Sequence, residues 1–342
     1  MRPHPDIPPP TLEELDRPDS SWNRAAVGSR QGDPFSCRTE WQLSLQSAYF
    51  PRRRLHLRRN DTSLLALAER RYPDLGPTLE PLDPLWLFGS PLLGPDALEL
   101  LEAFLAERSA AAEPTTTLVS GVLPGETLRE RLLRRLGSRF EVYRVKTVTV
   151  CRADLANGLD GFLARRSRAL RKGLRQAARR AGDRGIRFER VVARSPREAD
   201  AAFRRILAVE RRSWKGIAGR GIESPASNAF YAAMARRLAA SASGRIIFAR
   251  IDERDVGYVF GGLADDHYRG QQFSYDEAFA DCSIGNLLQQ EQVRWLAEEG
   301  IRHYDMGPLM AYKRHWTEQR ISMEVLLLRE RAHGGGRDRI ER

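Results

Sequence analysis

Residues 245–306 constrain the fold of this chain more than any other segment. They begin with three runs rich in β-branched and aromatic residues, which are separated by short acidic turns at 252–255 and 264–266. Such a pattern is typical of an antiparallel meander. The three expected strands are 245–251, 256–263 and 267–275.

The residues after this meander return to a helical period. Apolar residues recur at helical spacing over 284–299, and Gly300 is suited to end a helix in the left-handed region. A strand at 302–306, one helical turn at 312–315 and a last strand at 322–328 are expected to follow. Because strands and helices are mixed in this order, the sequence predicts an α+β fold with helices on a mixed sheet.

Helices precede the meander. A strongly basic helix is expected over 159–181. Ser195 as N-cap, Pro196 at the first position and Glu198 in a capping box predict a second helix to about 214. A third helix is expected from Pro225 to about 242.

The first half of the chain shows a similar order of elements. Helices are expected at 39–49, 95–108 and 127–136, and strands at 55–58, 64–68, 85–88, 115–120 and 140–151. We therefore predict two tandem lobes, 35–155 and 156–330. The polar, Pro- and Gly-rich ends, 1–34 and 331–342, are expected to be a disordered arm and tail.

Composition narrows the function classes. The 342 residues include 56 Lys and Arg against 45 Asp and Glu, which favours an anionic partner, although a compositional bias explains the total equally well. The 3 cysteines and 6 histidines are scattered, so no metal site is expected. No transmembrane or secretory segment is apparent, and the chain is expected in the cytoplasm.

The turn between the third meander strand and the next helix is a candidate phosphate site. Consecutive backbone N–H groups at a helix N-terminus attract a pyrophosphate, and Gly285 allows close approach to the backbone. An ordinary helix start gives the same pattern. The candidate donor-binding residues are Phe273, Ser274, Tyr275, Ser283, Ile284, Gly285, Asn286 and Leu287.

Lys313 stands out in a chain whose cations are almost all arginine. It is one of only 4 lysines, and it lies between Tyr312 and Trp316 after a strand that contains Asp305. A compact ammonium can serve where a guanidinium cannot, although a surface lysine is an equally good interpretation.

These stretches together resemble a known family. The basic opening helix, the E-R-R-S-W helix end, F-S-Y-D-E-A-F-A-D-C-S-I-G-N-L-L, H-Y-D-M-G and the Y-K-x-x-W box resemble the acetyltransferases that include CelD-type cellulose-biosynthesis proteins. That family is a GNAT-fold relative of the Fem peptidoglycan-bridge transferases. The resemblance covers about half of the chain, 162–328, and a Q/R-x-x-G-x-G/A phosphate loop is missing.

The resemblance implies two GNAT-like lobes, of which the second binds an acyl donor. The pantetheine of acyl-CoA would lie between the strands 267–275 and 302–306, its pyrophosphate would lie on 283–287, and Lys313 would assist the reacting complex. The implied reaction moves an acyl group to an amine of a small molecule, a sugar or a peptide.

Other residues of this segment are candidates for the chemistry. Asp276 and Asp305 lie at strand ends and are candidates for the general base, although aspartate there more often caps a turn. His267 and His303 are weaker candidates. The residues expected to contact the acceptor are Trp214, Tyr304, Tyr312 and Trp316.

The basic helix leaves two further functions open. Arg165, Arg168, Lys172, Arg175 and Arg179 share one face over 163–181, opposite an apolar stripe of Leu163, Leu170, Leu174 and Ala178. This face could bind tRNA or another anion, or could simply be solvated. The alternatives are therefore a Fem-like transferase that uses aminoacyl-tRNA, and a non-catalytic anion-binding protein.

Overall fold

A computed structural model describes residues 11–29, 32–111, 115–125 and 127–331. It contains one continuous sheet in the order β1-β2-β3-β5-β12-β6-β11-β10-β9-β8-β7, with β4 paired to β2. Most neighbours are antiparallel, whereas β3–β5 and β10–β11 are parallel. The sheet is therefore mixed, and the predicted α+β class is confirmed.

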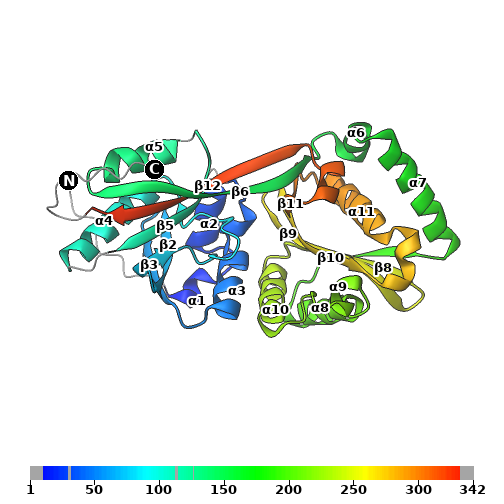
Figure 1. The fold of residues 1–342 in the computed structure, drawn as a ribbon. Helices are drawn as coiled ribbons and strands as arrows, with labels where there is room; N and C mark the ends of the chain where they lie inside the picture. The colour runs from blue at the N-terminus through cyan, green and yellow to red at the C-terminus, as the bar shows by residue number, and fades with distance from the viewer. Residues whose placement is uncertain (1–10, 30–31, 112–114, 126, 332–342) are drawn as a thin grey trace.

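The first lobe forms one half of this sheet (Figure 1). Its elements are α1 (Leu12–Leu15), α2 (Ser21–Gly28), η1 (Phe35–Cys37), α3 (Thr39–Tyr49), β1 (Arg54–Arg59), β2 (Leu64–Tyr72), β3 (Gly76–Glu80), β4 (Leu92–Leu93), α4 (Ala97–Ala110), β5 (Thr116–Val122), α5 (Thr127–Leu136) and β6 (Phe140–Asp154).

The second lobe contains the predicted meander and the helices that flank it. In Figure 1, α7 and α11 lie on one face of its strands, and α8 and α10 lie on the other. The elements are α6 (Gly158–Ala164), α7 (Arg168–Asp183), β7 (Arg187–Val191), α8 (Pro196–Glu210), α9 (Trp214–Ile217), α10 (Pro225–Ala240), β8 (Gly244–Ile251), β9 (Arg254–Ala264), β10 (His267–Tyr275), η2 (Glu277–Cys282), α11 (Ile284–Glu298), β11 (His303–Pro308), η3 (Ala311–His315) and β12 (Gln319–Glu330).

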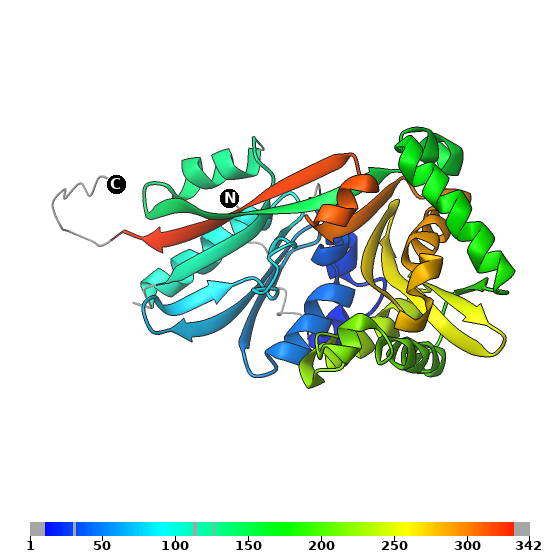
Figure 2. The ribbon, with the colours of Figure 1, turned by 45° about the vertical axis from the view of Figure 1, so that its right-hand side comes forward.

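The two long strands β6 and β12 join the lobes. They pair with each other along nearly their full length, and both run from one lobe into the other (Figure 2). The last strand, expected in the second lobe, also pairs with β5 of the first. An aromatic and aliphatic core crosses the boundary too, because Trp41 of α3 packs edge-on against Phe230 of α10 with ring centroids 5.3 Å apart.

The predicted disorder of 1–34 is wrong for the described residues of that arm. Trp22 is buried, and its indole N–H donates to the Cys37 carbonyl at 2.8 Å. Asp33 is buried as well and accepts a hydrogen bond from Ser36 Oγ at 2.8 Å. The segment contains two short helices, α1 and α2, which its polar composition did not predict because a few buried contacts stabilise them. Of the predicted tail, Arg331 donates its N–H to the Arg139 carbonyl, and 332–342 lie outside the described residues.

Two further predictions need correction. The expected strand 85–88 is a turn, because the Asp83 carboxylate accepts hydrogen bonds from the N–H groups of Trp86 and Phe88. The basic segment forms two helices, α6 and α7, with Ser167 as the N-cap of the second. Consequently Ala177, not Ala178, continues the buried stripe of α7 after Leu174.

Candidate active site

The two central parallel strands of the second lobe diverge. β10 and β11 are in register only at His267–His303, Tyr268–Tyr304 and Arg269–Asp305. Each strand then has an irregularity, between Gly270 and Gln272 in β10 and between Asp305 and Gly307 on β11. Asp305 Oδ1 accepts the Gly307 N–H at 2.8 Å, and Gly307 has a φ of +80° that favours glycine. The expected gap between these strands is therefore present.

The open edge of β10 presents backbone groups to this gap. Asp276 N–H donates to the Val256 carbonyl at 2.9 Å, on the side of β9. Because alternate residues of a strand direct their amides to opposite edges, Phe273 and Tyr275 direct theirs away from β9 and toward the gap. These N–H groups are suited to hold a developing oxyanion.

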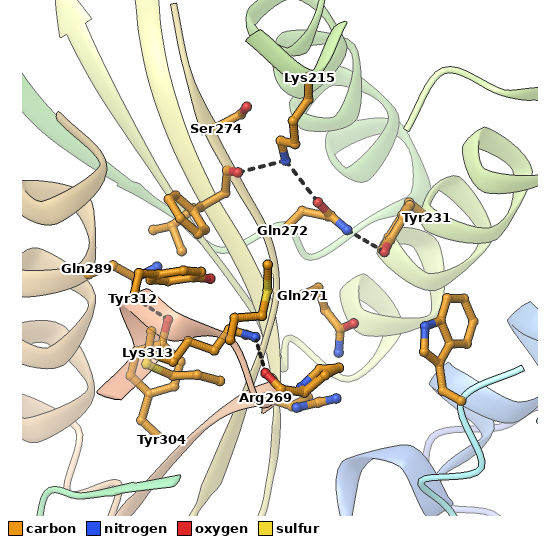
Figure 3. Close-up of a pocket in the computed structure, with 18 of the residues that line it drawn as sticks. Lys215, Tyr231, Arg269, Gln271, Gln272, Ser274, Gln289, Tyr304, Tyr312 and Lys313 are labelled. Atoms are coloured by element: carbon orange, nitrogen blue, oxygen red, sulfur yellow. Dashed lines mark hydrogen bonds between the residues drawn. The ribbon is translucent and has the colours of Figure 1, made fainter. Parts of the chain in front are cut away.

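A cavity of about 380 Å³ occupies the gap (Figure 3). Its floor is β10, and β11 from Tyr304 to its end at Pro308, η3 and the first lobe add further walls. Among the described residues that line it there is no aspartate or glutamate. The residues that line it include Trp41, Trp86, Phe88, Trp214, Lys215, Tyr231, Arg269, Gln271, Gln272, Phe273, Ser274, Tyr275, Gln289, Tyr304, Tyr312 and Lys313.

Lys313 reaches into the cavity from η3. Its side chain is only 5% exposed, and Nζ donates to the Pro308 carbonyl at 2.8 Å. Burial, and next the positive charge of Arg269, lower the pKa of Lys313 to about 8. Lys313 thus places in the gap an ammonium group that forms no ion pair with a described carboxylate.

Lys215, on α9, is a cavity residue that the sequence analysis did not select. Its Nζ donates to the Phe273 carbonyl at 2.9 Å and to Gln272 Oε1 at 3.2 Å, and lies 3.5 Å from Glu210 Oε1. Burial lowers the pKa of Lys215, and Glu210 offsets part of that effect. Gln272 Nε2 in turn donates to the Tyr231 hydroxyl at 2.6 Å. In the sequence, two signals could have identified Lys215: it follows Trp214 directly, and it is one of only 4 lysines.

The two candidate bases do not line the cavity. Asp276 accepts hydrogen bonds from Arg212 at 2.8 Å and Arg254 at 2.5 Å. Although burial favours its neutral form, hydrogen bonds from Arg212, the Ala278 N–H and Arg254 hold the pKa of Asp276 below its ordinary value. The geometry thus gives Asp276 a structural role.

Asp305 is buried beneath the gap. It accepts a hydrogen bond from Arg269, whose Nε lies 3.3 Å from Asp33 Oδ2. Burial raises the pKa of Asp305, and Arg269 opposes this rise. This network fixes the point at which β11 leaves β10. His267 and His303 stack at the closed end of the strands with centroids 4.4 Å apart, and neither lines the cavity.

The turn predicted to bind pyrophosphate does not line the cavity either. Ile284, Gly285 and Leu287 are buried, whereas Asn286 is exposed. The Phe273 and Tyr275 rings cover Gly285, since a Cβ there would lie 3.2 Å from each ring. Of the predicted donor-binding residues, Phe273, Ser274 and Tyr275 line the cavity, and Ser283, Ile284, Gly285, Asn286 and Leu287 do not.

Three of the four predicted acceptor residues line the cavity. Trp214 is 51% exposed at its rim, and Tyr304 donates its hydroxyl to Gln289 Oε1 at 2.5 Å. Tyr312 packs against Phe273 with centroids 5.8 Å apart, and burial raises the pKa of Tyr312 to about 12. Trp316 does not line the cavity. It is buried and stacks on Phe162, which corrects its predicted placement.

The basic face of α7 lies outside this cavity. Arg168, Lys172, Arg175 and Arg179 are exposed and form no ion pair with the described residues. Arg165, expected on the same face, instead pairs with Glu318 at 3.1 Å. No group of three or more His, Cys, Asp or Glu within the described chain is arranged to hold a metal ion. None of the described helices has the length and apolar character of a membrane span.

Residues 168–314 match the family model described as "Acetyltransferase (GNAT) domain". The second lobe thus matches a GNAT acetyltransferase domain, which supports a transferase. The comparison with curated proteins gave no match.

Solved structures resemble nearly the whole chain. FemX is 11% identical, with a TM-score of 0.64 over 89% of this chain and 94% of that one. A conserved protein of unknown function from Bacteroides thetaiotaomicron VPI-5482 is 12% identical, with a TM-score of 0.62 over 96% and 100%. L-PGS from Bacillus licheniformis is 12% identical, with a TM-score of 0.54 over 94% and 93%. This likeness concerns the fold alone, and it confirms a mixed sheet flanked by helices in two lobes, of which the second matches the GNAT family model.

Proposed function

We propose that this protein is an acyltransferase that moves an acyl group from an activated donor to an amine of a small molecule, a sugar or a peptide. The observation that carries the proposal is the divergence of β10 (His267–Tyr275) from β11 (His303–Pro308) around a cavity lined by backbone amides. The gap holds both reactants in one place, which supplies much of the rate enhancement in such reactions.

The reaction consists of one addition and one elimination. The amine nitrogen attacks the carbonyl carbon of the donor, the new C–N bond forms, and the bond to the thiol or alcohol leaving group breaks. We assign the Phe273 and Tyr275 N–H groups to the oxyanion, with the ammonium of Lys313 adding positive charge nearby. Because Asp276 and Asp305 are engaged by arginines, we propose that the amine reacts as the free base and releases its proton to water.

Acyl-CoA is the first candidate for the donor, since it is the donor that a GNAT acetyltransferase domain implies. The rings over Gly285 mean that its pyrophosphate would have to approach the turn from the exposed side of Asn286. Two arginines are close to this turn in the fold: Arg180 donates to the Asp281 carbonyl, and Arg184 donates to the Asp281 carboxylate. The narrower CelD-like assignment and the cytoplasmic location remain predictions.

Aminoacyl-tRNA is the second candidate, and a different observation favours it. The exposed cations of α7 (Arg168–Asp183) form no ion pair with the described residues, so they are available to the phosphates of a tRNA backbone. An ester-linked aminoacyl group could enter the cavity without using the covered turn at Gly285. FemX and L-PGS, which share the fold, make this donor class worth testing.

The decisive experiment offers both donors with a panel of amines. Release of thiol from acetyl-CoA, or of free tRNA from aminoacyl-tRNA, should depend on the amine and fall in Lys313→Met. Aminoacyl-tRNA binding should weaken steeply with salt. If neither donor is consumed with any amine, the protein is a non-catalytic anion-binding protein and the proposal is wrong.

A further inference from the structure

The cavity is unusually one-sided in charge. Three cations line it, Lys215, Arg269 and Lys313, and none of the described lining residues is an aspartate or glutamate. The described chain as a whole is less unbalanced, with many arginines paired to carboxylates. The cavity therefore favours negative charge in whatever enters it.

The three cations differ in how far the protein compensates them. Arg269 is paired with Asp305 and lies 3.3 Å from Asp33, and Lys215 Nζ lies 3.5 Å from Glu210. Lys313 Nζ donates to the Pro308 carbonyl at 2.8 Å and lies 5.7 Å from the centroid of the Tyr312 ring, and no described carboxylate forms an ion pair with it. Because a buried charge normally requires a counterion, Lys313 is the cation that an incoming anion would pair with.

Two neutral polar groups in the same cavity also lack partners. Gln271 Nε2 and Ser274 Oγ are buried, and neither forms a hydrogen bond within the described chain. In Figure 3 the Gln271 amide points away from Lys215, to the side of the cavity where Arg269 lies. Buried donors without partners are uncommon in proteins, and in a cavity they are the groups that a ligand satisfies.

We infer that the cavity binds a substrate that carries a carboxylate, paired with the Lys313 ammonium and hydrogen-bonded by Gln271 Nε2. The binding of a carboxylate does not depend on the proposed function. Only the question of which reactant carries the carboxylate rests on the proposed acyl transfer. The first-lobe wall of Trp41, Trp86 and Phe88 accommodates an aromatic or aliphatic body. A volume of about 380 Å³ lies within the range of small-molecule sites and is large enough for an aromatic amino acid.

Binding is tested without any donor or turnover, by calorimetry with 3-phenylpropanoate and its neutral isostere 3-phenylpropanamide. The carboxylate should bind about tenfold or more tightly, as expected for a charge-assisted hydrogen bond. Lys313→Met should abolish the difference, and Gln271→Leu should reduce it. Lys172→Met, which removes an exposed lysine of α7, is the matched control and should leave it unchanged.

Several outcomes would overturn the inference: equal affinity for the two compounds, binding of neither, or an equal loss in Lys172→Met. Circular dichroism establishes whether Lys313→Met folds, and Gln271→Leu gives an independent answer if it does not. Transfer of uncharged acyl groups to uncharged amines, with no preference for a carboxylate on either reactant, would disprove the inference while leaving the proposed function intact.

Kinetics then identify the reactant that carries the carboxylate. If it is the acceptor, amino acids should have a KM about tenfold lower than their amides, and this preference should vanish in Lys313→Met. If it is the acyl group, succinyl-CoA should be preferred to acetyl-CoA in the same way. If Lys313→Met lowered kcat but kept the roughly tenfold difference in KM between charged and neutral substrates, Lys313 would act on the oxyanion alone and carboxylate binding would be contradicted.

Discussion

The two lobes contain the same strand–helix–strand unit, but only one of the units is open. In the second lobe β10, α11 and β11 leave a cavity where the strands diverge. In the first lobe β3, α4 and β5 form the equivalent parallel pair, with Thr78 opposite Thr116 and Leu79 opposite Thr117. The chain itself then fills the space beside β5, since Ser120 Oγ donates to the Gly89 carbonyl at 2.5 Å and Gly121 packs on Ser90.

The buried cations of the two units differ in the same way. In the first lobe Arg53 Nη1 lies 2.6 Å from Glu80 Oε1, and Nη2 donates to the Leu82 carbonyl at 2.7 Å. In the second lobe Lys313 has one carbonyl partner and faces a cavity. The comparison indicates that a cation fully satisfied by the protein supports the fold, whereas one left partly unsatisfied is available to a ligand.

Exchanging each cation for methionine should separate these roles. Arg53→Met leaves Glu80 buried without its partner and should lower the free energy of unfolding by about 3–5 kcal/mol. Lys313→Met should lower kcat about 100-fold, as loss of a group that stabilises an oxyanion does. Denaturant unfolding and steady-state kinetics measure the two effects.

The comparison would be wrong if Arg53→Met lowered kcat and Lys313→Met lowered the free energy of unfolding. Folded Arg53→Met should retain its kcat, and Lys313→Met should be no less stable than the natural protein because a desolvated charge has been removed. A large loss of stability in Lys313→Met would make this lysine structural as well.

The open unit was largely predictable from the sequence, whereas only α4 and β5 of the closed unit were predicted. Local signals mark β10, α11 and β11: alternating strands, acidic turns, and Gly300 after the helix. In the first lobe the strand β3 was missed, and the turn at Trp86 was taken for a strand because the capping role of Asp83 depends on the fold around it. The disordered-arm prediction failed for the same reason, since tertiary contacts hold Trp22.

The site was predicted best where its residues are close in sequence. Tyr304 on β11 and Tyr312 and Lys313 on η3 line the cavity, as does the predicted Trp214 of α9. Lys215 reaches it from a separate helix, and Asp276 is taken out of it by Arg212 and Arg254. Contacts between residues far apart in the sequence leave no local sequence pattern. The sequence therefore indicated which residues could take part in the chemistry, but not which partners each of them would have.

Alkaline pH should distinguish the two cations without any mutation at Arg53, since an arginine remains charged throughout the accessible range. The pKa of Lys313 is about 8 in the folded protein and about 10.5 when unfolded, so the unfolded state binds more protons between these values. Stability relative to Lys313→Met should therefore rise with pH from 8 to 9, by at most about 1.4 kcal/mol per pH unit. Urea midpoints of both proteins at pH 7, 8 and 9 measure this difference, and parallel curves would contradict the lowered pKa.

The smallest effect concerns a segment of the first lobe that contributes to the cavity of the second. The segment that fills the first lobe's gap carries Trp86, whose ring lies 5.8 Å from Phe230 and lines the cavity of the second lobe. Trp86→Ala should raise KM about three- to tenfold with kcat nearly unchanged, because a binding wall is lost while the oxyanion donors of β10 stay in place. Leu85→Ala, at an exposed position of the same turn, is the matched control and should change neither constant. Equal effects of the two substitutions would mean that the turn acts through stability alone, and a fall in kcat for Trp86→Ala would mean that the first lobe helps to shape the reacting geometry itself.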